Sequence, residues 1–335
     1  MNCSSHYSEF THNDDHTNTK LVHFHRMSND GFPEKAVDPS ITPLPHWKLF
    51  NCFAIFQPRK TTRLNAEQAR RLDLERRTPT PLIIPALSFT KMRAQVDATP
   101  YAWPTSGGIN PMTTALVIID MQKDFCSPDG YLVQQGCSIA PVRAVIPHIK
   151  ELLTIFRKLN FPIYHTREGH RPDLSTLSAR ELSRSRNNPS GLGIGDKGPL
   201  GRLLVRGESG HDIIPELYPI EGEQIIDKPG RSAFQHTDFK LMLNIRGIKN
   251  LVICGVTTDV CVHSTMREAN DNNFDCLLVE DASAASEEIL HAHAVESVKA
   301  EGGIFGAVAT VDKVLETLGA KQAGLLTNGQ IKSAG

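Results

Sequence analysis

Residues 114–120 read Thr-Ala-Leu-Val-Ile-Ile-Asp, and this short run decides the fold class. Six consecutive residues that are mostly apolar and β-branched, without polar alternation, are typical of a strand buried on both faces of a parallel sheet. Parallel strands need a crossover between them, so the flanking sequence should alternate strands with helices. Asp120, which follows the run, would then lie at the carboxyl edge of the sheet.

The chain from about residue 93 onward follows this alternation. From Ala140 to Leu159, apolar residues recur at helical spacing, which predicts one long helix. Further strands are predicted at 161–165, 223–227, 251–254, 275–279 and 306–309, and further helices at 237–245, 260–272, 287–300 and 311–318. This order predicts an α/β fold, namely a three-layer αβα sandwich on a parallel sheet of about six strands.

Both ends of the chain lack this pattern. Residues 1–92 show no sustained period and are predicted to be a poorly ordered N-terminal extension, with a partner-binding arm as the alternative for its basic stretch. Residues 321–335 are predicted to be a C-terminal tail, which leaves one domain at 93–320. Within that domain the long span 167–221 follows the end of a strand and is a candidate substrate lid or oligomer contact.

Charge and hydropathy exclude several classes of protein. Thirty-six Lys and Arg against 37 Asp and Glu give a net charge of −1, without the basic excess of a nucleic-acid-binding protein. No run of eighteen apolar residues is present, so no membrane-spanning helix and no membrane partner are predicted. The seven cysteines are an odd number without Cys-x-x-Cys spacing, which predicts free thiols and a reducing, cytoplasmic location.

Chemically useful side chains follow three of the predicted strands. Asp120 ends one strand, Lys228 follows another, and Cys261 lies where the run Gly255-Val-Thr-Thr-Asp-Val-Cys261 enters a helix. Taken singly, each has an ordinary interpretation: a turn cap, a solvated lysine and a buried structural cysteine. Because the carboxyl ends of parallel strands share one edge, the three side chains should converge there. A carboxylate, an ammonium and a thiol form a workable set for acyl transfer.

These motifs together resemble the isochorismatase-like cysteine hydrolases. The resemblance rests on Asp120-Met-Gln122, Lys228 and the Gly255–Cys261 run, in that order, and covers about residues 96–318. It implies a catalytic triad of Asp120, Lys228 and Cys261, no metal or organic cofactor, and a cis peptide bond at Val256–Thr257. Backbone N–H groups of Thr257 and Cys261 are expected to form the oxyanion hole.

Finer motifs most resemble the biuret amidohydrolase branch, with ureidoacrylate amidohydrolase as a more distant match. The segment His165-Thr-Arg-Glu-Gly-His170 lacks the Asp-x-His metal pair of nicotinamidases, so substrate or loop hydrogen bonding is favoured over metal binding by His165, His170 and Asp173. Substrate-binding residues are expected, by the resemblance, to be Phe125, Arg167, Glu168, His170 and Glu301. Glu301 stands where biuret hydrolases have Gln, and its negative charge would disfavour anionic substrates.

The sequence therefore predicts a cysteine-dependent amidohydrolase that cleaves a C–N amide bond of a small, biuret-like ureide through a thioester. Asp120 is expected to accept the Cys261 thiol proton while Lys228 stabilises the charge. The alternatives are a vinyl-ether or ester hydrolase, and a catalytically silent binding subunit on the same fold. A homo-oligomer, tetramer or dimer, is expected.

Overall fold

The computed structural model describes residues 94–319, which contain a six-stranded sheet in the order β5-β2-β1-β6-β7-β8 with every pair parallel. The strands are β1 (Thr114–Ile119), β2 (Ile163–Glu168), β5 (Gln224–Lys228), β6 (Asn250–Val256), β7 (Asp275–Ala284) and β8 (Ala307–Ala309). The predicted strand number and direction are confirmed. The predicted extension at 1–92 and tail at 321–335 lie outside the described residues.

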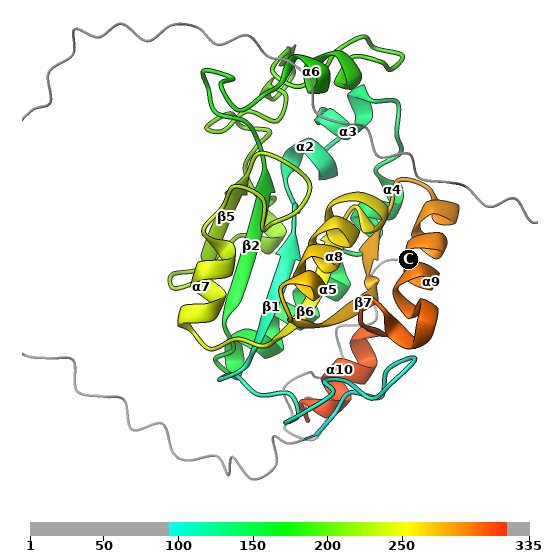
Figure 1. The fold of residues 1–335 in the computed structure, drawn as a ribbon. Coiled ribbons are helices and arrows are strands. Elements are labelled where there is room, and N and C mark those ends of the chain that lie inside the picture. The colour runs from blue at the N-terminus through cyan, green and yellow to red at the C-terminus, as the bar shows by residue number, and fades with distance from the viewer. Residues whose placement is uncertain (1–93, 320–335) are drawn as a thin grey trace, which may run out of the picture. The chain divides into compact units, whose positions relative to one another are not determined.

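Helices cover both faces of this sheet, which gives the three predicted layers (Figure 1). Leu116 and Ile118 of β1 pack into one core cluster, and Ala115, Val117 and Ile119 pack into the other, because alternate strand residues point to opposite faces. The first face is covered by α4 (Ala140–Ala144), α5 (Ile146–Lys158) and α10 (Val311–Thr317), and the second by α7 (Phe239–Ile245), α8 (His263–Asp271) and α9 (Glu288–Gly303).

Two predicted elements have a different form. The helix expected at 140–159 is divided into α4 and α5, since Pro147 lies in the first turn of α5 and has no N–H with which to continue the α4 hydrogen bonds. The helix expected from 260 begins as a π-helical turn, η3 (Thr258–Val262), before α8. Cys261 lies within this turn.

The span between β2 and β5 carries short elements rather than a bare loop. These are α6 (Ala179–Ser185), the antiparallel pair β3 (Lys197–Gly198) and β4 (Gly201–Arg202), and η2 (Pro215–Leu217). In Figure 1, α6 lies beyond the same end of the sheet as α2 (Lys123–Cys126) and α3 (Tyr131–Gln134). This end is the one where β1, β2 and β5 finish.

Close contact between β1 and β6 depends on Gly255. Its φ is +110°, and a Cβ atom there would lie 2.2 Å from the carbonyl oxygen of Ile119. Only glycine fits, since it has no Cβ and tolerates positive φ. The peptide bond between Val256 and Thr257 is cis, as the resemblance implies, and the chain then enters η3.

No helix within residues 94–319 combines the length and the apolar character needed to cross a membrane.

Candidate active site

The three residues predicted as a catalytic triad converge at the carboxyl ends of their strands. Asp120 follows β1 and Lys228 ends β5, and both side chains are 0% exposed. The Lys228 ammonium lies 2.7 Å from Oδ2 of Asp120 and also donates a 2.8 Å hydrogen bond to the carbonyl oxygen of Gly230. Cys261, in the π-helical turn after β6, is 4% exposed. The structure thus brings the expected acid, cation and thiol into one buried site.

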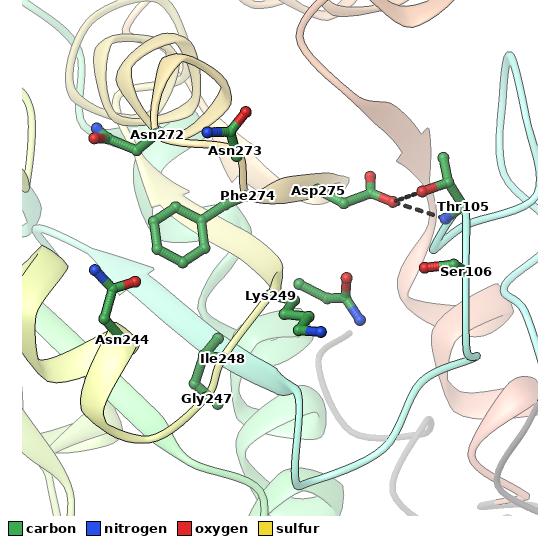
Figure 2. A pocket seen from close by; sticks show the side chains of 11 residues that line it. Thr105, Ser106, Asn244, Gly247, Ile248, Lys249, Asn272, Asn273, Phe274 and Asp275 are labelled. Carbon is green, nitrogen blue, oxygen red and sulfur yellow. Dashed lines mark hydrogen bonds between the residues drawn. The ribbon is translucent and has the colours of Figure 1, made fainter.

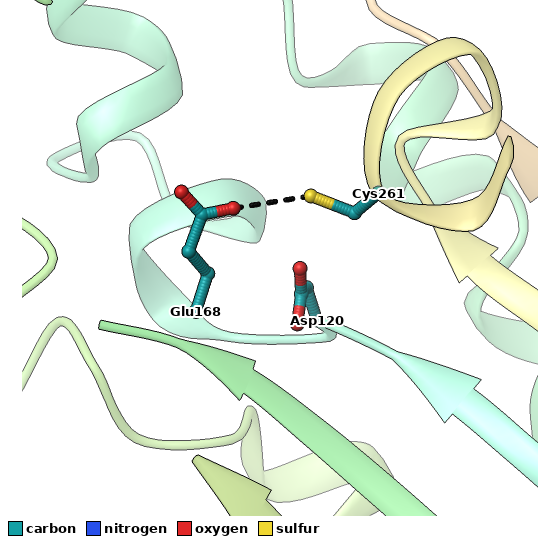
Figure 3. A group of neighbouring side chains, drawn as sticks. All are labelled: Asp120, Glu168 and Cys261. Atoms are coloured by element: carbon teal, nitrogen blue, oxygen red, sulfur yellow. Dashed lines mark hydrogen bonds between the residues drawn. The ribbon is translucent and has the colours of Figure 1, made fainter. Parts of the chain in front are cut away.

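The thiol makes its hydrogen bond to a different carboxylate from the one expected. Sγ of Cys261 lies 3.1 Å from Oε2 of Glu168, the last residue of β2. The candidate donor atoms of Asp120, Glu168 and Cys261 lie within 4.8 Å of one another, and Figure 3 shows the three side chains pointing toward a common space. Lys228 lies 3.4 Å from Oε2 of Glu168 and therefore bridges both acids. Glu168, expected as a substrate contact, lies in the same buried cluster as Asp120, Lys228 and Cys261.

Burial and mutual charge set the electrostatics of this cluster. Burial raises the pKa of Asp120 despite the opposing charge of Lys228. Burial acts in the same direction on Glu168, but the positive charges of Lys228 and Arg231 outweigh it and lower that pKa. Burial also raises the pKa of the Cys261 thiol, and Lys228 opposes this effect. The directions of these shifts favour ionisation of Glu168 over ionisation of Asp120, and they favour a protonated sulfur at Cys261.

A clamp around the backbone of Glu168 keeps it in this position. The side chain of Gln122 accepts a 2.7 Å hydrogen bond from the N–H of Glu168 and donates one of 2.9 Å to its carbonyl oxygen. It also donates to the carbonyl oxygen of His211, at 3.0 Å, which ties the β2–β5 span to the site. Thr166, two residues before Glu168 on the same strand face, donates a 2.6 Å bond to Oδ1 of Asp120. Neither Gln122 nor Thr166 was predicted as a site residue, although Gln122 belongs to the Asp120-Met-Gln122 motif.

Lys228 occupies the place that a cation would otherwise take among these carboxylates. Within the described residues, Asp120, Glu168 and Cys261 are the one group whose donor atoms could jointly hold a metal. The ammonium supplies positive charge to both acids, at 2.7 Å from Asp120 and 3.4 Å from Glu168. The three residues that could have held a metal after β2 have other partners: Glu223 for His165, Thr176 for His170, and Ser175 for Asp173.

The other expected substrate contacts divide into two groups. Phe125 on α2 is 7% exposed and packs edge-on against Tyr131, with ring centroids 6.2 Å apart, on the side of the site covered by α2 and α3. His170 is buried and lies in the electrostatic field of Glu168. Arg167 points the other way, because neighbouring strand residues face opposite sides, and pairs with Asp227 at 2.7 Å. The structure does not bring Arg167 to the thiol.

Glu301 requires a correction. It lies in the kinked end of α9, with φ +51°, and is exposed. Since α9 returns from the carboxyl end of β7 to the start of β8, its last residues lie at the amino edge of the sheet, opposite Cys261. The next turn confirms this position, because the carbonyl oxygen of Phe305 accepts a hydrogen bond from Asn270 near the end of α8. Within one chain Glu301 does not line the catalytic site, and the argument against anionic substrates no longer applies.

A separate polar cavity of about 490 Å³ also lies at this amino edge (Figure 2). Lys249 and Asn250 at the start of β6 and Asp275 at the start of β7 line it. Asp275 accepts hydrogen bonds from the backbone and hydroxyl of Thr105. The cavity is therefore separated from the thiol by the length of the sheet.

Comparison with known proteins agrees with the fold. The family model described as the isochorismatase domain matches residues 114–312, more than half of the chain. The chain therefore belongs to the isochorismatase family and is a hydrolase.

Relatives and solved structures add detail. The chain is 30% identical over 224 residues to the ureidoacrylate amidohydrolase RutB of Pantoea ananatis, which is 66% of this chain and 88% of the relative. It is 29% identical over 239 residues to that of Serratia proteamaculans, covering 70% and 95%. A crystal structure of a cysteine hydrolase from Pseudomonas syringae pv. phaseolicola is similar with a TM-score of 0.54 at 25% identity, covering 63% of this chain and 95% of that one.

Proposed function

We propose that this hydrolase cleaves a C–N amide bond of a small ureide by nucleophilic attack of Cys261. The observation that carries the proposal is the buried hydrogen bond between the Cys261 thiol and Glu168, with Lys228 bridging Glu168 and Asp120. A thiol with a carboxylate acceptor and a fixed cation can carry out nucleophilic acyl transfer. The ureide class is supported by the names of the amidohydrolase relatives.

In the first half of the reaction, the Cys261 thiol gives its proton to Glu168 as Sγ forms a bond to the carbonyl carbon. The carbonyl oxygen becomes an oxyanion, which the backbone N–H groups of Thr257 and Cys261 stabilise. Glu168 then returns its proton to the nitrogen as the C–N bond breaks, and ammonia or an amine leaves. Sγ remains acylated as a thioester.

In the second half, water attacks the thioester carbon and gives a proton to the Glu168 carboxylate. The C–S bond breaks, the acid product leaves, and Glu168 returns the proton to the sulfur. Lys228 keeps the buried carboxylates and the transient thiolate compensated throughout, while Asp120 fixes the ammonium at 2.7 Å. The scheme needs no metal or organic cofactor.

We also propose a biuret-like substrate, a cytoplasmic location and a homo-oligomeric assembly. The motifs of the β2–β5 span support the substrate, and the free thiols among the described cysteines support the location.

The test is ammonia release from a panel of ureides and simple amides by the full-length protein and by Cys261→Ser. We expect wild-type turnover and a loss of at least about 1,000-fold in Cys261→Ser, because a serine hydroxyl is not ionised by this site. Cys137→Ser, which changes a half-buried cysteine outside the site, should keep wild-type activity. Near-normal turnover in Cys261→Ser, or release of pyruvate from a vinyl ether without ammonia from any amide, would contradict the proposal.

A further inference from the structure

Glu181 of α6 holds two arginines next to the buried cluster around Cys261. Its carboxylate is buried and accepts a hydrogen bond from Arg231, which follows Lys228 by three residues. It accepts another, at 3.1 Å, from Nε of Arg184 on α6 itself. Burial raises the pKa of Glu181, but the hydrogen bonds from the two guanidinium groups outweigh it and lower that pKa to about 2. Glu181 is therefore ionised at neutral pH and fixes Arg231.

These side chains and the cluster around Cys261 form one network of ion pairs. Three carboxylates balance three cations: Asp120, Glu168 and Glu181 against Lys228, Arg184 and Arg231. In a balanced network, removal of one charge changes the electrostatic potential at the other groups. Loss of a cation raises the pKa of the remaining carboxylates, and loss of an anion lowers it.

The charge of Arg231 acts on Glu168, the carboxylate that lies against the thiol. Burial raises the pKa of Glu168, but the positive charges of Lys228 and Arg231 outweigh it and lower that pKa. The interaction is mutual, since burial lowers the pKa of Arg231 while the Glu181 hydrogen bond and the Glu168 charge raise it. Lys228 lies 2.7 Å from Asp120 and 3.4 Å from Glu168, so it is shared between two acids. Arg231 is the second cation that acts on Glu168.

Several other titratable or charged groups interact with Glu168, and they come from each element packed against it. They are Asp120 after β1, Tyr131 on α3, His170 in the β2–β5 span, Lys228 on β5 and Cys261 in η3. Burial lowers the pKa of His170 below its ordinary value of 6.5 and raises the pKa of Tyr131, so both are neutral at pH 8. Of this set, His170 is the group that needs a control at acidic pH.

We propose that Arg231 is a positioning residue that keeps Glu168 ionised beside the Cys261 thiol, and that Glu181 anchors Arg231 and balances its charge. The inference rests on the proposed function, in which Glu168 accepts the thiol proton. A guanidinium suits this role because it stays charged at every working pH and its planar fork binds a carboxylate in a fixed direction. The β2–β5 span, through Glu181 of α6, then contributes charge to the site as well as part of its wall.

The test compares two variants that break the same ion pair but remove opposite charges. The measurement is the pH profile of kcat/KM from pH 4.5 to 8, by ammonia release from the best ureide of the panel with the full-length protein. Activity is lost as the pH falls through the pKa of Glu168. Arg231→Gln should therefore move this acid limb to higher pH by about one unit. Glu181→Gln should leave it in place or move it to lower pH.

Two controls accompany these variants. Arg231→Lys keeps the positive charge and should leave the acid limb within about 0.3 pH units of wild type. Arg180→Gln removes a cation that lies 3.7 Å from Glu181 but is 84% exposed, so solvent screens it and the profile should not change.

A second measurement needs no substrate. It is the rate of alkylation of Cys261 by iodoacetamide at pH 8, where His170 is neutral. Loss of a positive charge should raise the pKa of the thiol and loss of a negative charge should lower it. Alkylation should be about 2- to 10-fold slower than wild type in Arg231→Gln and faster than wild type in Glu181→Gln.

The outcomes separate this inference from the proposed function. Shifts in the same direction in Arg231→Gln and Glu181→Gln would show that their ion pair only supports the structure, and the inference would be wrong while the amidohydrolase stands. The inference is also wrong if the shifted limb of Arg231→Gln disappears when His170→Gln is added, because His170 would then be the titrating group. If no ureide or amide is hydrolysed, the proposed function fails, and the alkylation rates still decide the role of Arg231.

Discussion

Two carboxylates and one ammonium surround the Cys261 sulfur, and their environments are not equivalent. Asp120 is held by Lys228 and Thr166 and its pKa is raised by burial, whereas Glu168 is hydrogen-bonded to the thiol and its pKa is lowered. Pairs of acids whose pKa values are displaced in opposite directions commonly divide the work of a site. Glu168, which contacts the thiol, is therefore the better candidate for the proton acceptor. Asp120 supports it by fixing Lys228.

Replacing Glu168 by Gln should separate turnover from thiol reactivity. The amide keeps the size of the side chain but cannot take a proton, so kcat should fall by about 100- to 10,000-fold. The negative charge of Glu168 contributes to the raised pKa of Cys261, so its removal should lower that pKa and speed alkylation of Cys261 by iodoacetamide at neutral pH. Ammonia release and mass-spectrometric labelling measure the two effects.

Glu208→Gln serves as the control, since it removes a partly exposed carboxylate from the β2–β5 span without touching the site. A merely structural role for Glu168 would slow both turnover and alkylation. If Glu168→Gln keeps kcat within tenfold while Asp120→Asn is inactive, the proton goes to Asp120, as the sequence motifs alone suggested.

At the scale of elements, Asp124 connects α2 to two other parts of the site wall. Oδ1 accepts the N–H of Tyr131 at the start of α3, at 3.3 Å, and Oδ2 accepts the N–H of Leu204 in the β2–β5 span, at 2.9 Å. The side chain is 1% exposed, and burial raises its pKa to about 6 although both backbone donors act to lower it. The wall of the site therefore contains a carboxyl group that is more easily protonated in the folded state than in the unfolded state.

This predicts a specific dependence of stability on pH. Because the folded pKa of about 6 lies above the unfolded value of 3.8, the folded state binds the proton more tightly. The contribution of Asp124 to stability is fully present below about pH 4 and is lost as the pH rises to about 6, by roughly 2–3 kcal/mol. Urea unfolding of wild type and Asp124→Asn from pH 4 to 7 measures it. The difference in unfolding free energy, wild type minus variant, should decrease over this range, and a difference that does not change with pH would refute the shift.

At the scale of the whole molecule, the sequence predicted a site residue correctly where that residue follows a recognisable strand and so reaches the carboxyl edge of the sheet. Asp120, Lys228 and Cys261 were predicted to meet because each follows a recognisable strand and parallel strands end together. Glu168 was assigned a lesser role because β2 was expected to end at His165, whereas it continues to Glu168 and aims that residue at the thiol.

Contacts near the site that join distant segments carried no usable periodic signal. Arg231, just after β5, donates a hydrogen bond to Glu181 of α6, which lies 50 positions earlier in the chain. The prediction that Glu301 contacts the substrate was wrong for another reason. It rested on a position in a family motif, and the motif does not show that α9 returns to the amino edge of the sheet before β8. Topology, rather than the motif, decides whether a residue can reach the thiol.

At the same scale, we predict that the folding unit begins near Met92. A chain starting at Met92 should fold and keep kcat/KM within about threefold, because residues from 94 onward already complete the core. Val96 and Trp103 are 0% exposed and pair through their backbones, and Thr99 exchanges two hydrogen bonds with Val308 of β8.

A chain starting at Gly108 would lose all of these contacts. Burial of two large apolar side chains is worth about 1.5–3 kcal/mol each, so this shorter chain should unfold at clearly lower urea concentration or fail to fold. Ammonia release and urea midpoints for the three chain lengths decide the boundary: an inactive or insoluble Met92 chain beside an active full-length protein would place residues 1–91 within the folding unit or the site.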